Sequence, residues 1–333
     1  MQLPTVADGG SAPAQTGQAS RSGSRRLWLW RSLQLLATVA AFVYVSSLVD
    51  GAQLMAALRR VPASRLLMVL GLAFFGLTLG VVRWWLLFRA FGAPRPPAFG
   101  RLYRYYLVGT FYNTFLPGGV GGDLVRALAA RDAWGPERAA TAGIATVLIE
   151  RVLGLAGLLA LVSLVSLLHP LPVMGQAWLP GVLGSCAVAG VLIGLRTAHW
   201  LAGYLPGRLA GLLLRLPQAE RWLPLLGAAL LSIATQLWPA FAGQLLLSSL
   251  SDKARLLDAL LFVPLATATA YLPISVSGAG VREVLFVKLY ESVGVPASSA
   301  LVVSLLIWFS IAVIAALGGV LTLLRPLASD IER

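Results

Sequence analysis

The sequence is poor in the residues that usually build redox, metal and catalytic sites. It has one cysteine and two histidines in 333 residues, so it carries neither a disulfide framework nor a cysteine-based metal site, and Cys186 lies in an apolar run where a packing role is expected. A Walker A loop, a nucleotide-binding glycine fingerprint and a Ser/His/Asp or Cys/His arrangement are also missing from the sequence. An ATP-driven pump is therefore excluded, and we expect no cofactor and no bound metal.

Charge is scarce as well, with 12% of residues charged and 58% apolar. A water-soluble domain of this length does not have that composition. Runs of about 20 apolar residues recur, and each is long enough to cross about 30 Å of hydrocarbon as a helix. Although the net charge is +13, the arginines fall mostly at the ends of apolar runs, so nucleic-acid binding is not indicated. The sequence predicts an all-α, polytopic integral membrane protein.

We expect six full spans, at about 28–49, 66–88, 138–168, 178–196, 222–247 and 297–324. They lie within one transmembrane domain, residues 27–326, between a disordered cytoplasmic tail at 1–26 and a short cytoplasmic tail at 327–333. The positive-inside rule places the arginine-rich segments 89–104 and 196–221 and both termini in the cytoplasm, and the uncharged segment 169–178 outside. Arg59, Arg60 and Arg65 go against this rule.

Two segments are apolar enough for the membrane but are interrupted by proline and glycine. They run from Phe115 to Arg126 and from Tyr271 to Arg282, and their aromatic, Leu, Pro, Val, Gly, Val and Arg residues coincide without gaps. Each is followed by a helical stretch, a proline and a full span. We therefore interpret the regions near 103–168 and 256–324 as an internal duplication.

Each interrupted segment should end one half-helix and begin another, because proline removes an amide donor and glycine lowers helix stability. Irregular backbone at membrane depth persists only inside protein or beside a water-filled cavity, so we expect two re-entrant hairpins. An odd number of spans separates them, which predicts entry from opposite faces and an inverted-topology repeat. Helices that are merely kinked, with arginines anchored at head groups, are the alternative. The expected hairpin-forming residues are Pro117, Gly118, Gly119, Gly122, Pro273, Gly278 and Gly280.

Glu150 and Arg151 lie about twelve residues into the expected span 138–168, where charge is costly and usually faces a bundle interior. Adjacent helical residues point about 100° apart, so the two should have different partners. We expect Glu150 to pair with Arg126 or Arg282. Arg83, followed by two tryptophans at a span end, is expected to anchor at the membrane interface.

Each hairpin also keeps one acidic residue near its arginine. Asp123 accompanies Arg126 in the first copy, and Glu283 accompanies Arg282 in the second. A salt bridge that closes each hairpin and a site that binds a ligand explain these residues equally well.

Three motifs in this order resemble the lysylphosphatidylglycerol synthase transmembrane, or flippase-like, family of bacteria and archaea. They are the segments 112–126, 147–154 and 272–283, and the resemblance covers about residues 30–325. It implies a shared polar core in which the candidate substrate-binding residues are Asn113, Asp123, Arg126, Glu150, Arg151, Arg282 and Glu283.

In the best-understood members, a membrane domain like this one is implicated in moving aminoacylated phosphatidylglycerol between leaflets, and a separate soluble domain attaches the amino acid. Other relatives are associated with hopanoids or lipid-linked sugars. This sequence ends at Arg333, shortly after its last expected span. We therefore expect no lysyl transfer from it, and the cargo stays open.

The leading hypothesis is a lipid translocase of the bacterial inner membrane that passes a phospholipid, polyprenyl-phosphate or hopanoid head group between the hairpins. Arg126 and Arg282 would hold its anionic part, because arginine binds phosphate oxygens bidentately. The expected partner is a membrane lipid, with a separate synthase or glycosyltransferase as a further candidate. An embedded enzyme on a lipid-linked substrate, using Asp123 and Glu150, and a non-transporting partner of such an enzyme are the alternatives.

Overall fold

The computed structural model describes residues 17–116, 121–135, 139–168, 219–253, 255–271 and 278–325, with short stretches between 186 and 211. Every regular element in these residues is a helix, which confirms the expected all-α class. The helices are α1 (Gly17–Leu48), α2 (Gly51–Arg59), α3 (Ala63–Ala90), α4 (Phe99–Phe115), α5 (Gly121–Ala129), η1 (Arg131–Trp134), α6 (Ala139–Leu168), α9 (Trp222–Leu247), α10 (Leu256–Ala268), η2 (Thr269–Tyr271), α11 (Val281–Glu291) and α12 (Ala297–Leu324).

Four of these helices are long and apolar enough to cross a membrane. They are α3, α6, α9 and α12, of 26 to 30 residues each, and they match four of the expected spans. Each exceeds the roughly 20 residues that a bilayer crossing needs. The chain is thus a multi-pass membrane protein, and the expected span 178–196 falls largely outside the described residues.

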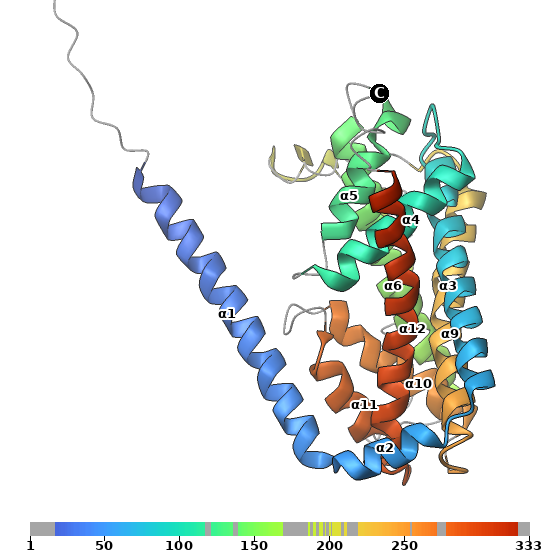
Figure 1. Ribbon diagram of the computed structural model, residues 1–333. Helices are drawn as coiled ribbons and strands as arrows, with labels where there is room; N and C mark the ends of the chain where they lie inside the picture. Colours follow the sequence, from blue (N-terminus) through green and yellow to red (C-terminus); the bar gives the residue numbers. More distant parts are fainter. Residues whose placement is uncertain are drawn as a thin grey trace, which may run out of the picture.

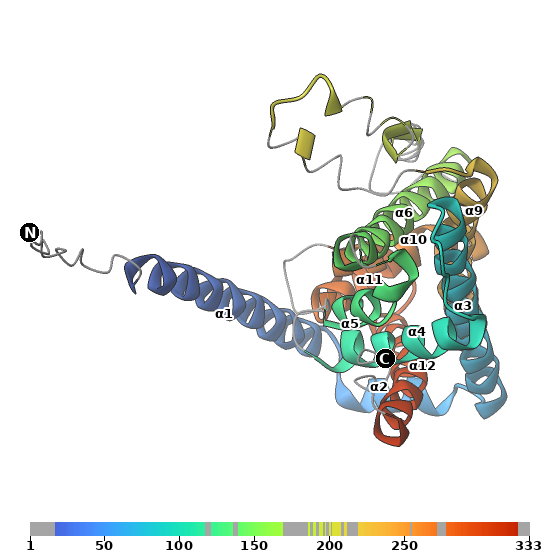
Figure 2. The same ribbon diagram turned by 90° about the horizontal axis from the view of Figure 1, so that it is seen from above.

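The expected span 28–49 ends in a sharp bend. Leu35–Leu48 and Gly51–Arg59 are long and apolar enough to span a membrane only when taken together, and the two helices meet at 80°. Asp50 sets the bend, because its side chain accepts a hydrogen bond from the Ala52 amide (3.1 Å) and so begins α2 as a new helix. Figures 1 and 2 show α1 standing apart from the other helices and approaching them toward its α2 end.

Two short helix pairs lie at opposite ends of the bundle, α4 with α5 and α10 with α11 (Figure 1). The long helix α12 contacts one pair with each of its halves. Near its start Ser304 bonds to Glu283 of α11, and near its end Gly318 packs against the Leu107 carbonyl of α4. The two helix pairs therefore contact opposite halves of α12.

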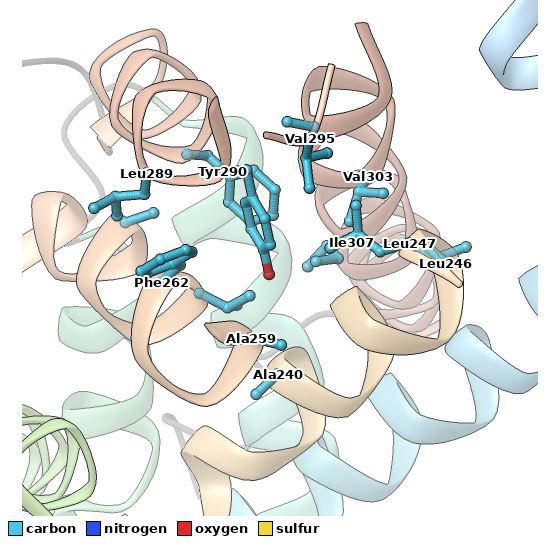
Figure 3. Close-up of a cluster of buried hydrophobic side chains, with 14 of the residues drawn as sticks. Ala240, Leu246, Leu247, Ala259, Phe262, Leu289, Tyr290, Val295, Val303 and Ile307 are labelled. Carbon is cyan, nitrogen blue, oxygen red and sulfur yellow. The ribbon is translucent and has the colours of Figure 1, made fainter. Parts of the chain in front are cut away.

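Each helix pair has its own apolar core, and we call α4 with α5 the first hairpin and α10 with α11 the second. Around α10 and α11, Tyr290 packs edge-on against Phe262 at 5.2 Å between ring centroids, among residues of α9 and α12 (Figure 3). Around α4 and α5, Phe88 of α3 stacks on Trp134 of η1 at 5.5 Å. Lipid tails are as apolar as these side chains, so close packing stabilises the bundle more than burial from water does. The two cores leave a polar zone between them.

Candidate functional site

The first hairpin is closed by Asn113, near the end of α4. Its side-chain oxygen accepts a hydrogen bond from the Gly122 amide (2.9 Å), and its Nδ2 donates to Asp123 Oδ1 (3.0 Å). Gly122 leaves no room for a side chain, because a Cβ there would lie 1.8 Å from the Gly109 carbonyl oxygen. The start of α5 is therefore held against α4, and this contact fixes the positions from which Asp123 and Arg126 project.

Gly122→Val is expected to destabilise the protein, because a side chain at this position must push the α4 backbone away. Overpacking of this kind costs about 1–3 kcal/mol. Thermal unfolding in detergent measures the loss. Gly121→Val is the matched control, since a Cβ at Gly121 has Leu116 Cδ1 as its nearest neighbour, at 3.6 Å. Equal melting temperatures for the two variants would contradict the tight approach.

Asp123 is a buried acceptor that joins three donors. Its Oδ1 accepts from Arg126 Nη2 (2.8 Å) as well as from Asn113, and its Oδ2 pairs with Arg151 Nε of α6. The side chain is 7% exposed. The pair with Arg126 lies within α5, whereas the bond from Asn113 joins Asp123 to α4 and the pair with Arg151 joins it to α6.

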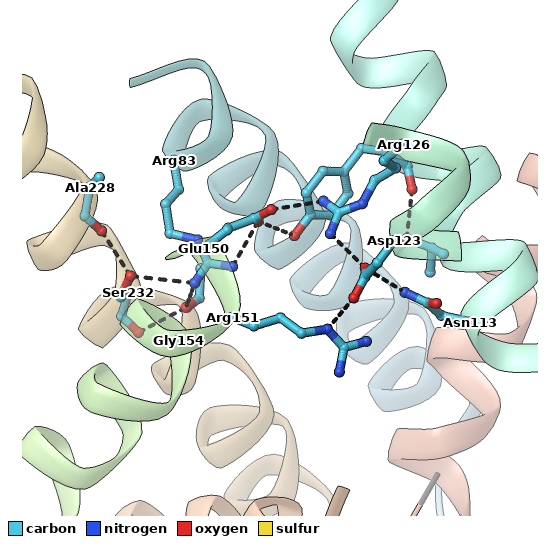
Figure 4. A network of polar contacts seen from close by, with 12 residues as sticks. Arg83, Asn113, Asp123, Arg126, Glu150, Arg151, Gly154, Ala228 and Ser232 are labelled. Atoms are coloured by element: carbon cyan, nitrogen blue, oxygen red, sulfur yellow. Dashed lines mark hydrogen bonds and ion pairs between the residues drawn. The ribbon is translucent and has the colours of Figure 1, made fainter. Parts of the chain in front are cut away.

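Glu150 is the second buried acceptor, at 1% exposure. Its Oε2 accepts from Arg126 Nη1 (2.9 Å), and its Oε1 accepts from Arg83 Nη2 (2.9 Å) and the Tyr106 hydroxyl (3.1 Å). Of the two expected partners the structure selects Arg126. Glu150 and Arg151 have different partners, as their helical spacing predicts. The whole network is drawn in Figure 4.

Arg83 was expected at the membrane interface, and that expectation is wrong. The residue is 9% exposed and pairs with Glu150, and its Nη1 makes long contacts of 3.4 Å to Ser232 and Thr235 of α9. Among the described residues its Nε has no hydrogen-bond partner. Arg89 fits the anchor role instead, in the last turn of α3 with its guanidinium 3.9 Å above the Trp85 ring. The position of Arg83 two turns inside the helix was the available signal.

The second hairpin is organised by Glu283. Its Oε2 accepts the Gly280 amide (2.8 Å) at the start of α11, and its Oε1 accepts from Arg282 Nε (2.9 Å) and Ser304 of α12 (3.4 Å). Gly278 and Gly280 have φ values of +78° and +80°, a left-handed backbone that favours glycine. The Glu283 carboxylate thus both caps the start of α11 and pairs with Arg282.

Two adjoining cavities lie between the hairpins. The larger, of about 330 Å³, is bordered by α6, α9, α10, α11 and α12 and is lined by Arg151 and Arg282 together with apolar side chains such as Val263 and Ile307. The smaller, of about 240 Å³, is bordered by α3, α4, α9 and α12 and is lined by Arg83. We call them the first and second cavity. The residues common to both linings are Thr235, Gln236, Trp238, Tyr271 and Ile311.

The candidate residues fall into two groups. Arg151 and Arg282 reach the first cavity, whereas Asp123, Glu150 and Glu283 pair with arginines and Asn113 bonds to Asp123. Arg126 lies outside both described linings, is bonded to two carboxylates and sits 4.5 Å from the Tyr106 ring. In the described part of the chain, no group of three or more His, Cys, Asp or Glu side chains could hold a metal ion. Pro117, Gly118, Gly119 and Pro273 lie outside the described residues.

A family model described as the lysylphosphatidylglycerol synthase TM region matches residues 32–319. The match spans every buried charge described above. No curated protein matches the chain.

Proposed function

The chain belongs to the lysylphosphatidylglycerol synthase TM region family, and we propose that it moves a lipid head group between the two leaflets of a membrane. The observation that carries the proposal is the pair of arginine-lined cavities between the two helix pairs. Polar and charged groups at membrane depth are expensive, and in membrane proteins they usually mark the path of a substrate or ion.

The first cavity suits an amphipathic ligand. Arg151 and Arg282 present guanidinium groups, while Val263, Phe286 and Ile307 present apolar surface. Arginine forks bind phosphate oxygens in two parallel hydrogen bonds. An anionic head group would therefore be held at the arginines, with neighbouring apolar atoms of the lipid against the aliphatic wall.

The opposed hairpins support a two-sided path. The order α4–α5–α6 repeats in α10–α11–α12, a broken pair followed by a long helix. In transporters built from inverted repeats, the substrate lies near the midplane where such broken helices meet. By the same reasoning we propose that the two regions are an inverted repeat.

We propose a bacterial inner membrane with both termini in the cytoplasm, and the distribution of arginines supports this orientation. Arg95 lies between α3 and α4, and Arg101 and Arg104 lie in the first half of α4. Arg104 bonds to the Arg325 carbonyl at the end of α12. The positive-inside rule assigns this end to the cytoplasm. Arg65, at the other end, goes against the positive-inside rule. It donates to the Leu245 carbonyl (2.8 Å) and to Ser248 (2.7 Å) at the end of α9, and this contact gives it a structural role.

Reconstitution into vesicles with tail-labelled anionic phospholipid tests the function. Wild-type protein is expected to transfer label to the outer leaflet. Arg151→Ala and Arg282→Ala are each expected to slow transfer about ten-fold or more, because each removes one charge-assisted contact worth about 1.5–3 kcal/mol. Arg59→Ala, which removes an exposed arginine of α2, is the control. Absence of transfer, or transfer indifferent to both cavity variants, would refute the proposal. Turnover of a lipid substrate would instead favour an embedded enzyme.

A further inference from the structure

The polar cluster between the two helix pairs carries an uneven number of charges. Its cations are the guanidinium groups of four arginines and its anions are the carboxylates of three acidic residues. They are Arg83, Arg126, Arg151 and Arg282, and Asp123, Glu150 and Glu283. Each carboxylate is ion-paired, which favours its ionised form. One positive charge is left over within the described residues.

The surplus is presented to the cavities. Arg83 lines the second cavity and Arg151 and Arg282 line the first, and no acidic residue is found among the described residues of either lining. The three carboxylates lie behind the arginines, with side-chain exposures of 7%, 1% and 1% for Asp123, Glu150 and Glu283. A ligand in either cavity therefore meets positive charge first.

A net charge inside a membrane protein is unfavourable unless a ligand or counter-ion compensates it. A ligand with one negative charge makes the occupied site neutral. A dianion would leave the site with a net negative charge, and a zwitterion would leave its positive charge uncompensated. An ammonium group on the ligand finds arginines and no free carboxylate.

We propose that the site selects a lipid whose head group is a phosphodiester with one net negative charge and no amine. Hydroxyl and amide groups of Thr235, Gln236 and Thr267 in the lining suit a neutral, hydroxylated substituent on that phosphate. Aminoacylated head groups, which carry extra positive charge, are rejected. This inference rests on the proposed function and specifies its cargo class.

Binding, rather than transfer, separates this inference from the function itself. Purified protein in neutral detergent is titrated with short-chain phosphatidylglycerol, phosphatidylethanolamine and lysylphosphatidylglycerol. We expect phosphatidylglycerol to bind about ten-fold more tightly than either amine-bearing lipid, since one compensated charge in a partly buried site is worth about 1.4 kcal/mol or more.

Arg282→Gln removes the surplus charge and is expected to abolish most of this preference, chiefly by weakening phosphatidylglycerol binding. Lys288→Gln is the matched control on the same helix, because Lys288 is exposed and bonds to Glu291 (3.0 Å) outside the cavities. If Arg282→Gln fails to fold, Thr267→Asp adds one negative charge to the first cavity and brings the net charge of the cluster to zero with all four arginines kept, and the same loss of preference is expected.

Three results are distinguishable. Equal affinity of the wild type for phosphatidylglycerol and lysylphosphatidylglycerol overturns the charge selection, even where vesicle transfer proceeds. A phosphatidylglycerol preference that survives both Arg282→Gln and Thr267→Asp overturns it too. Selective binding without any transfer in vesicles refutes the translocation proposal and supports the charge selection.

Discussion

Glu150→Gln is expected to cause the largest loss of stability of any single substitution in the polar cluster. The carboxylate accepts hydrogen bonds from Arg83, Arg126 and Tyr106 and is 1% exposed. Removing its charge leaves two arginines facing a neutral amide whose NH2 group can only donate. Breaking a buried ion pair from one side costs about 3–5 kcal/mol. Denaturant unfolding in detergent micelles measures this change.

The same substitution is expected to abolish lipid transfer in vesicles. Arg83 lines the second cavity, and Glu150 is what holds its Nη2 in place (2.9 Å). Glu291→Gln is the matched control, because Glu291 bonds to exposed Lys288 and exposed pairs contribute about 0–1 kcal/mol. If Glu150→Gln unfolded like Glu291→Gln and transferred lipid at the wild-type rate, the network around Glu150 would have neither a structural nor a functional role.

The sequence was informative about which residues form the cluster and less so about how they pair. Charges inside apolar runs identified Asp123, Arg126, Glu150 and Arg151, and the structure brings all four together. Pairing depends on side-chain direction across helices that are distant in sequence. For this reason Arg83, 67 residues from Glu150, was missed as a partner, and the enclosed place of Arg126 could not be predicted.

Hydropathy located the four long helices because an apolar run of that length has few other folds in a membrane. It did not distinguish a straight span from a bent one, so the 80° bend after α1 was missed. Asp50 carries the local signal, an N-cap residue followed by glycine within an otherwise apolar stretch. The inverted repeat stays a prediction, because the count of intervening spans includes the expected span 178–196, which lies largely outside the described residues.

Gly154 of α6, one turn after Glu150, lies beside residues that line the two cavities. A Cβ at this glycine would lie 3.0 Å from the Tyr271 hydroxyl oxygen and 3.5 Å from Arg83 Nη1. Gln236 Nε2 donates to the Gly154 carbonyl (3.3 Å). Tyr271 and Gln236 line both cavities. The missing side chain of Gly154 thus keeps space open beside residues that both cavities share, and under the proposed function a head group moving from Arg282 to Arg83 would pass these residues.

Gly154→Leu is expected to stop this passage while binding in the first cavity persists. Its side chain would fill the space between Tyr271 and Arg83. Overpacking of this kind would raise the free-energy barrier of the passage by about 1–3 kcal/mol, which slows transfer about ten- to hundred-fold. Vesicle transfer and short-chain phosphatidylglycerol binding are measured on the same preparation. Val152→Leu, on the 48% exposed outer side of α6, enlarges a side chain of the same helix without reaching the cavities, and should transfer normally. Wild-type transfer by Gly154→Leu would show that lipid does not cross between the cavities at this point.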